Sequence, residues 1–248
     1  MATTATLQEH AQPLEAFIGE TRAQETPAEA FGNETARTLR IEVDGGVWLK
    51  PGAAVAYRGD LVFERRPTLD AESVKDAVLR ETAALVCARG RGRLFCASHG
   101  AHIRTIHLAG ETLVVTWQDL LAFEESLTFE CSLVGHGIGL AAGGLVAVTI
   151  TGHGSLALTS HGRPVTLAVT PDQPVFTDPH ATVAWSAGLT PALKTDLSWR
   201  SAFAHGGHEP FQMAFTGAGF VVVQAYEDAS RIQFTPRPLK QLAKLLGA

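Results

Sequence analysis

Histidines are the residues of this sequence whose type and spacing most readily suggest chemistry. Two pairs stand three positions apart, His99 with His102 and His205 with His208, and Glu209 directly follows the second pair. Imidazole nitrogens are common metal ligands, but a spacing of three points two side chains to opposite faces of a strand. A loop can bring such side chains together. His205 and His208 are therefore the candidate metal site of this sequence. The expectation is that the protein binds no metal and no cofactor, and this site is the alternative.

A serine in the run Ala184-Trp185-Ser186-Ala187-Gly188 partly matches the G-x-S-x-G motif of serine hydrolases. That motif places its serine on a turn from a strand to a helix within an α/β sheet. The leading glycine is missing here, and short β-type runs surround the segment. We therefore interpret Trp185 as a core aromatic residue, matched by Phe123, and we expect no catalytic residue in this protein.

Composition limits the class of protein. The chain has 248 residues, of which 46% are hydrophobic and 18% charged, and it contains 24 glycines and 12 prolines. These proportions predict an all-β protein with many turns and short strands. The three cysteines, Cys87, Cys96 and Cys131, form no C-x-x-C pair, so neither a disulfide framework nor a zinc ribbon is expected.

Charge and hydropathy narrow the partners and the location. The formal net charge is −5, so nucleic-acid binding, which favours a basic surface, is not expected despite the cluster Arg89, Arg91 and Arg93. The N-terminus lacks the basic start and apolar run of a secretory signal. Glycines interrupt the apolar stretch Ile138–Ile150, which is shorter than the roughly 20 residues of a membrane helix. We expect a cytoplasmic protein.

An internal repeat accounts for two of the histidines. Ser98-His99-Gly100 recurs as Ser160-His161-Gly162, an offset of 62 residues (160 − 98 = 62), and apolar residues and glycines keep the same register. Lys50-Pro51-Gly52 holds the equivalent place in a shorter first copy. Such repeats predict look-alike units that pack against one another. Gly-flanked polar residues are typical of turns, so we interpret His99 and His161 as turn residues rather than catalytic groups.

Glycine pairs supply a second set of expected turns. Gly90 with Gly92, and Gly152 with Gly154, repeat at the same offset, and each G-x-G is predicted to reverse the chain between two short strands. The tripeptide Arg58-Gly59-Asp60 resembles an adhesion motif, but we interpret it as another hairpin turn. None of these segments continues as a phosphate-binding loop.

The chain is expected to divide into a core and two ends. Residues 1–38 are predicted to form a flexible lead-in with a short helix near Gln12–Arg22, and residues 229–248 a tail with a short amphipathic helix. A further helix is predicted over Leu69–Leu85. The core, 39–228, is predicted to hold three tandem β-sandwich units in a pseudo-threefold arrangement, at about 39–82, 83–143 and 144–228.

Several segments resemble one known family. They are Lys50-Pro51-Gly52 with Phe63-Glu64-Arg65, then Leu120–Leu127, Ser160–Leu167 and, most specifically, the run from Asp178 to Gln224. Over about residues 38–226 the chain is similar to bacterial relatives of the altered inheritance of mitochondria protein 24-like family of inner-membrane biogenesis proteins. The resemblance implies three β-sandwich units like the subunit of the tryptophan RNA-binding attenuation protein, and it implies no catalytic motif. The lead-in and the charged segment Asp70–Glu81 depart from the family pattern.

Two functions from different classes stay open at this point. The first is a non-enzymatic binding or scaffolding protein, linked to membrane organisation by the family resemblance, with protein partners or further copies of itself and with possible peripheral membrane contact. The second is a metal- or small-molecule-binding β protein that uses His205 and His208. The first is preferred, because no residue pattern specifies a reaction.

Overall fold

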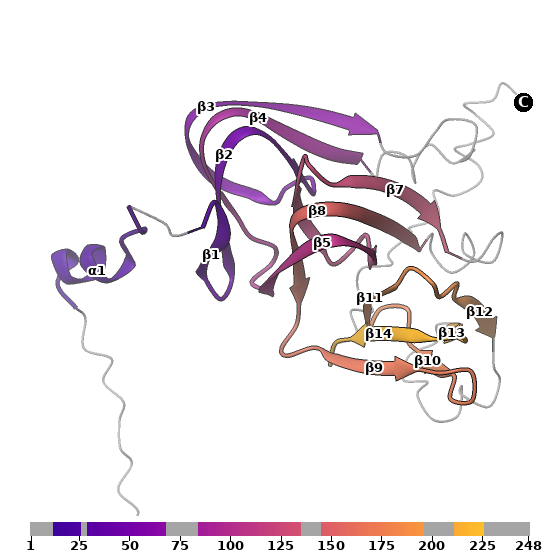
Figure 1. Cartoon of the computed structure of the whole chain (residues 1–248). Coiled ribbons are helices and arrows are strands. Elements are labelled where there is room, and N and C mark those ends of the chain that lie inside the picture. Colours follow the sequence, from indigo (N-terminus) through magenta and orange to yellow (C-terminus); the bar gives the residue numbers. More distant parts are fainter. Residues whose placement is uncertain (1–11, 26–28, 68–83, 135–144, 196–210, 226–248) are drawn as a thin grey trace, which may run out of the picture.

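A computed structural model describes residues 12–25, 29–67, 84–134, 145–195 and 211–225 (Figure 1). Within these ranges the chain forms one helix and fourteen strands, so the expectation of an all-β protein is confirmed. In chain order the elements are α1 (Leu14–Thr21), β1 (Phe31–Thr35), β2 (Thr38–Leu49), β3 (Ala54–Pro67), β4 (Ala84–Cys96), β5 (His102–Thr116), β6 (Leu120–Glu124), β7 (Thr128–Leu133), β8 (Val146–Ser160), β9 (Val165–Val169), β10 (Val175–Thr177), β11 (Thr182–Ser186), β12 (Ala192–Thr195), β13 (Phe211–Phe215) and β14 (Gly219–Val223).

Five strands are longer than the short runs that the sequence predicts. β2, β3, β4, β5 and β8 are 12, 14, 13, 15 and 15 residues long, and each carries glycine near its middle. Figure 1 shows β2, β3 and β4 curving over together. Arg58-Gly59-Asp60, Gly90–Gly92 and Gly152–Gly154 therefore lie inside continuous strands. The prediction that these segments are hairpin turns is wrong.

Close backbone contact explains the glycines at the bend of β3 and β4. A Cβ atom on Gly90 would lie 2.0 Å from the carbonyl oxygen of Asp60, and Gly90 has a φ of +129°. A Cβ atom on Gly92 would lie 2.3 Å from the carbonyl oxygen of Arg58. Glycine alone permits such an approach without strain, so the G-x-G pair bends two paired strands together instead of ending one.

Two antiparallel sheets contain all the described strands. The larger has eleven strands, whose main path runs β3-β4-β2-β6-β8-β5-β11-β14-β9, while β1 pairs with β2 and β7 with β8. The smaller runs β10-β13-β12. The longest pairing joins β5 to β8, from His102 opposite Ser160 to Thr116 opposite Ala147. β3 and β9 therefore form the two ends of the main path.

Three clusters of buried apolar side chains make up the core. The central cluster includes Phe123, a second includes Leu39 and Leu94, and the third includes Trp185 and Phe215. The rings of Trp185 and Phe215 have centroids 5.6 Å apart. Phe123 is 0% and Trp185 2% exposed, which confirms that both are core aromatics.

Strand positions follow the 62-residue offset in part. β6 and β11 begin at Leu120 and Thr182, 62 residues apart, and β4 and β8 begin at Ala84 and Val146, at the same offset. Gly52, Gly100 and Gly162 all have positive φ in the turns that follow β2, β4 and β8. A threefold repeat is nevertheless not confirmed, because most strands join one continuous sheet. The division of 39–228 into three units stays a prediction.

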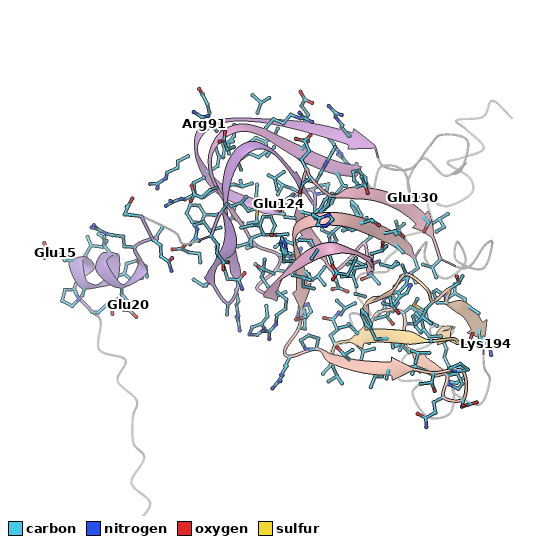
Figure 2. All side chains as sticks on the ribbon, viewed as in Figure 1. Glu15, Glu20, Arg91, Glu124, Glu130 and Lys194 are labelled. Atoms are coloured by element: carbon cyan, nitrogen blue, oxygen red, sulfur yellow. The ribbon has the colours of Figure 1, made fainter. Side chains whose placement is uncertain are left out.

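The chain ends depart from the expected layout. α1 agrees with the helix predicted near Gln12–Arg22 and stands apart from the strands (Figure 2), whereas β1 lies inside the expected lead-in and pairs with β2. Of the helix predicted over Leu69–Leu85, residues 68–83 fall outside the described ranges, and the last two residues belong to β4. The tail, 229–248, also falls outside them. No helix in the described part of the chain is long and apolar enough to span a membrane.

Candidate functional site

The histidines of the two Ser-His-Gly triplets lie in turns, as predicted. His99 is exposed after β4 and has a left-handed backbone, with φ of 45°, while His161 lies in the equivalent turn after β8. The backbone N–H of His161 donates a hydrogen bond to Oε1 of Gln224 at 2.8 Å. This contact fastens the turn to the residue that follows β14, which is a structural task.

The candidate metal ligands His205 and His208 lie outside the described residues. His102, the partner of His99 in the other pair, begins β5. Among the residues that the structure describes, no three His, Cys, Asp or Glu side chains gather as a metal ion would require. The expectation that the protein binds no metal and no cofactor stays a prediction.

Ser186 is part of an antiparallel strand pair. Its Oγ accepts a hydrogen bond from the backbone N–H of Phe220 at 3.0 Å, which links the end of β11 to β14. The residues after Ser186 form a turn that leads to β12, not a helix. The strand-to-helix turn of a hydrolase nucleophile is therefore missing at this position.

The arginines of β4 form a ladder of ion pairs. Two of them lie directly opposite acidic residues of β2 in the strand register. Opposite charges at such positions stabilise strand pairing, and each arginine of the cluster has a carboxylate partner. The pairs are Arg93 with Glu42, Arg91 with Asp44, and Arg89 with Glu125. The ladder therefore offers less unpaired positive charge than a nucleic-acid surface needs.

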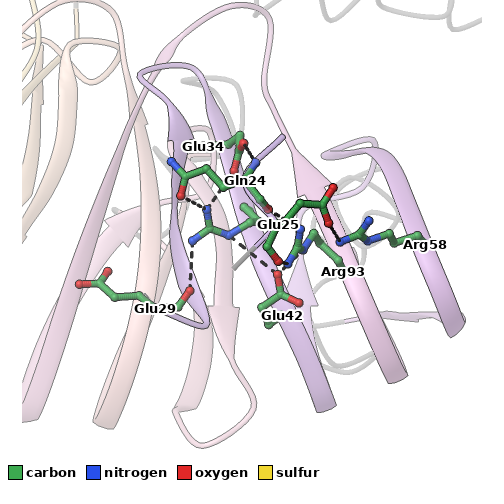
Figure 3. Close-up of polar contacts among 8 residues, drawn as sticks. Gln24, Glu25, Glu29, Glu34, Glu42, Arg58 and Arg93 are labelled. Carbon is green, nitrogen blue, oxygen red and sulfur yellow. Dashed lines mark hydrogen bonds and ion pairs between the residues drawn. The ribbon is translucent and has the colours of Figure 1, made fainter. Parts of the chain in front are cut away.

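Two buried arginines hold the segment that follows α1 (Figure 3). Arg40 is 3% and Arg93 5% exposed. Arg93 donates to the backbone carbonyl oxygens of Gln24 and Glu25 at 2.6 and 3.0 Å, and Arg40 donates to that of Glu29 at 3.1 Å. Buried cations are stable only with such partners. The N-terminal segment therefore completes this end of the core.

Glu34 supplies the counter-charge for Arg40. Its Oε2 atom lies 2.9 Å from Nη1 of Arg40, and its Oε1 atom accepts the backbone N–H of Gln24 at 2.7 Å. Burial raises the pKa of the Glu34 carboxyl, but the Gln24 N–H and the Arg40 guanidinium together outweigh burial and hold that pKa below its usual 4.5. Glu34 is therefore ionised at neutral pH, and the network consists of matched charges.

A second buried polar group joins three distant parts of the chain. Asp119, 3% exposed, lies in the turn between β5 and β6. Its Oδ2 accepts from the Thr116 hydroxyl at 2.9 Å, and Nε2 of Gln224 lies 3.4 Å from its Oδ1. Its backbone carbonyl accepts the N–H of Thr159 at 2.7 Å. Its hydrogen bonds thus tie the ends of β5, β8 and β14 together.

An apolar cavity of about 410 Å³ is formed by β5, β8, β9, β11 and β14. Its apolar walls include Ile106, Leu108, Leu158, Phe220 and Val222. Three charged or titratable side chains of β5 also line it, namely Arg104, His107 and Glu111. This volume lies in the range of small-molecule sites.

A second hollow, of about 520 Å³, is more open and lies over the bend of β2, β3 and β4. It is bordered by Asp44, Arg58, Arg91 and Arg93. Arg58 lies 3.7 Å from Glu25, and the other two arginines belong to the ladder. The charged side chains that border this open hollow are already paired within the protein. The apolar cavity is therefore the stronger candidate for a ligand site.

Sequence reasoning singled out neither the buried contact between Asp119 and Gln224 nor Arg104 in the lining of the apolar cavity. Asp119, Gln224 and Arg104 are contributed by segments far apart in the chain, and none of them stands in a recognisable motif. Arg104, Ile106 and Leu108 stand at alternate positions, which is typical of one face of a strand. Nothing in the local sequence indicates that β14 lines the same cavity.

Comparisons with known proteins agree with this fold. A family model described as mitochondrial biogenesis AIM24 matches residues 29–226. Among solved structures, the X-ray crystal structure of protein SPYM3_0169 from Streptococcus pyogenes is similar, with a TM-score of 0.58 and 18% sequence identity, over 88% of this chain and 96% of that chain. At such an identity the likeness shows the fold alone. A search of curated proteins finds no match.

Proposed function

Because the chain belongs to the mitochondrial biogenesis AIM24 family, we propose that it is a non-enzymatic binding and scaffolding protein that assembles through its edge strand β3. The family description names biogenesis rather than a reaction, which is consistent with this class of function. One observation carries the proposal, namely the exposure of β3 on both of its faces.

β3 is an edge strand with little cover. It pairs only with β4 among the described strands, and residues 54–60 are all exposed. The apolar side chains Val55, Tyr57 and Val62 are 59%, 55% and 65% exposed. A long edge with unpaired backbone groups and apolar side chains is a template for another strand. Its charged residues select which strand can pair.

A second copy of β3 fits this edge by charge. In antiparallel pairing centred on Leu61, Arg58 of each copy would lie opposite Glu64 of the other copy, and the two-fold symmetry makes that contact twice. Tyr57 would lie opposite Arg65 in the same register, which allows a cation–π contact. Opposite charges across antiparallel strands stabilise their pairing, and two-fold dimers are the commonest oligomers.

The neighbouring register is disfavoured by the same rule. With the pairing centred on Val62, Arg58 would face Arg66, and Asp60 would face Glu64. Both contacts join like charges, which destabilise a strand pair. The charge pattern of β3 therefore favours one self-pairing register over its neighbour.

Charge exchange tests the proposed dimer. Sedimentation of the full chain over a range of concentrations should give a dimer, and Arg58→Glu should weaken dimerisation by about tenfold or more, because two attractive contacts become repulsive. The double variant Arg58→Glu, Glu64→Arg should recover it. Arg163→Glu, a change in an exposed turn, is the matched control. A monomeric wild-type protein at about 100 μM, or a double variant as weak as the single one, refutes the proposal.

A metal site at His205 and His208 concerns residues outside the described part of the chain, and no observation favours it. Cytoplasmic location and peripheral membrane contact also stay predictions.

A further inference from the structure

Two strands of the larger sheet line the apolar cavity with alternating residues. Arg104, Ile106 and Leu108 alternate along β5, and Phe220 and Val222 alternate along β14, which β11 separates from β5 in the strand order. Alternate residues of a strand share one face, so an apolar face of β5 and one of β14 both line the cavity. A pocket with apolar walls and few polar groups is typical of a site for a small organic ligand.

Nearly all the polar side chains of the cavity bond within the protein. The hydroxyl groups of Thr112 and Thr151 lie 2.9 Å apart, and the Ser160 hydroxyl donates to the Gly162 carbonyl at 3.0 Å. Thr159 donates to the carbonyl of Asp119 at 3.3 Å. At the charged positions, Nδ1 of His107 is 3.4 Å from the Ser155 hydroxyl, and Glu111 accepts the Ala109 N–H. These groups are engaged in the fold itself.

Arg104 differs from them. It makes no ion pair or side-chain hydrogen bond with any residue in the described part of the chain, and its cross-strand neighbour is Leu158. Arg40 and Arg93, by contrast, each bind several protein oxygens. A guanidinium group presents a planar fork of donors that matches a carboxylate. At the edge of an apolar cavity, such a group is suited to hold the charged head of an amphipathic molecule.

We infer that this cavity binds a small carboxylic acid with an apolar chain, whose carboxylate pairs with Arg104 and whose chain lies against the apolar faces of β5 and β14. The orientation follows from the charges on β5. Glu111 lies seven positions beyond Arg104 on the same strand and is a carboxylate itself. The Glu111 carboxylate repels the carboxylate of the ligand from its own end of the cavity. The ligand carboxylate is therefore expected at the Arg104 end.

Calorimetric titration of the full chain with octanoate and decanoate tests the site. Saturable binding is expected, and decanoate should bind about fifteenfold more tightly than octanoate, because each of its two additional buried methylenes contributes about fourfold. Arg104→Gln should weaken decanoate binding at least tenfold, the loss expected for a charged hydrogen-bonded pair. Octanol, which has no charge, should bind wild type and Arg104→Gln alike.

Two further variants make the result specific. Arg163→Gln removes an exposed arginine that does not line the cavity, and it should leave decanoate binding unchanged. Ile106→Trp fills the cavity and should abolish binding of both acid and alcohol. Because Arg104 is exposed, its variant is expected to fold even if Ile106→Trp does not.

Three results overturn the inference. The first is the lack of saturable decanoate binding below the concentration at which decanoate self-associates. The second is an equal effect of Arg104→Gln and Arg163→Gln. The third is binding to vesicles of anionic phospholipid without binding of the soluble acid, which would assign Arg104 to a lipid surface instead.

Discussion

Replacement of Arg93 by leucine isolates the contribution of a buried arginine to stability. Arg93 is 5% exposed, pairs with Glu42 and donates to two backbone carbonyl oxygens of the segment after α1. Loss of one partner of a buried ion pair costs about 3–5 kcal/mol. The lower end applies here, because Glu42 is 34% exposed at its side chain and can be hydrated when Arg93 is removed. We therefore expect Arg93→Leu to lower the free energy of unfolding by about 3 kcal/mol.

Thermal unfolding measures this effect. For a chain of this length, 1 kcal/mol corresponds to a change in Tm of about 2–4 °C, so Arg93→Leu should lower Tm by about 6–12 °C. Arg91→Leu is the matched control, because Arg91 lies two positions away on β4 and pairs with Asp44 in the same ladder, but both side chains are strongly exposed. Exposed pairs contribute little, so its Tm should fall by less than half as much.

The comparison of the two variants decides the matter. Equal decreases in Tm would show that burial and the backbone contacts of Arg93 add nothing to a simple ion pair. Arg93→Lys is informative as well, because lysine keeps the charge but lacks the planar guanidinium group with which arginine reaches three separate acceptors. An intermediate Tm is expected for that variant.

Two further predictions concern backbone geometry and pH. Gly90→Ala should lower the free energy of unfolding in urea by about 2–4 kcal/mol, because its Cβ would meet the Asp60 carbonyl at a positive φ. Gly52 also has positive φ but open space around it, so Gly52→Ala should lower that free energy by only about 1 kcal/mol. Equal losses of stability in the two variants would contradict the close-approach argument. Burial raises the pKa of the Cys96 thiol from 9.0 to about 12, so the unfolded state loses this proton first as pH rises. Stability in urea should therefore fall between pH 9.0 and about 12, and Cys96→Ala should remove this part of the pH dependence, whereas an unchanged slope would exclude Cys96 as its source.

Local patterns predicted the class of fold and several positions in it. Phe123 and Trp185 were matched through the repeat, and both are buried. The Ser-His-Gly triplets were predicted as turns, and they are turns because the glycine after each histidine adopts positive φ. These features depend on neighbouring residues in the chain, which is why the sequence was sufficient for them.

The interior glycine pairs show where local reasoning ends. A glycine such as Gly90 gives the same local signal whether the chain reverses or a long strand bends. The outcome depends on the carbonyl group of Asp60 on β3, which lies 30 residues before Gly90 in the chain (90 − 60 = 30). The same limit applies to Arg40 and Arg93. Their residue type predicts exposure, but the carbonyl groups that bury and satisfy them come from the segment after α1.

By itself, the amino-acid sequence determined an all-β chain, the turns at its two Ser-His-Gly triplets, two core aromatic residues and the absence of a recognisable catalytic motif. Tertiary structure alone decided that β3 is an exposed edge, that the arginines of β4 are paired, and that Arg104 borders an apolar cavity without a described partner. The physical reason is that alternation along a strand specifies which face is apolar. Only the packing of distant strands specifies what covers that face.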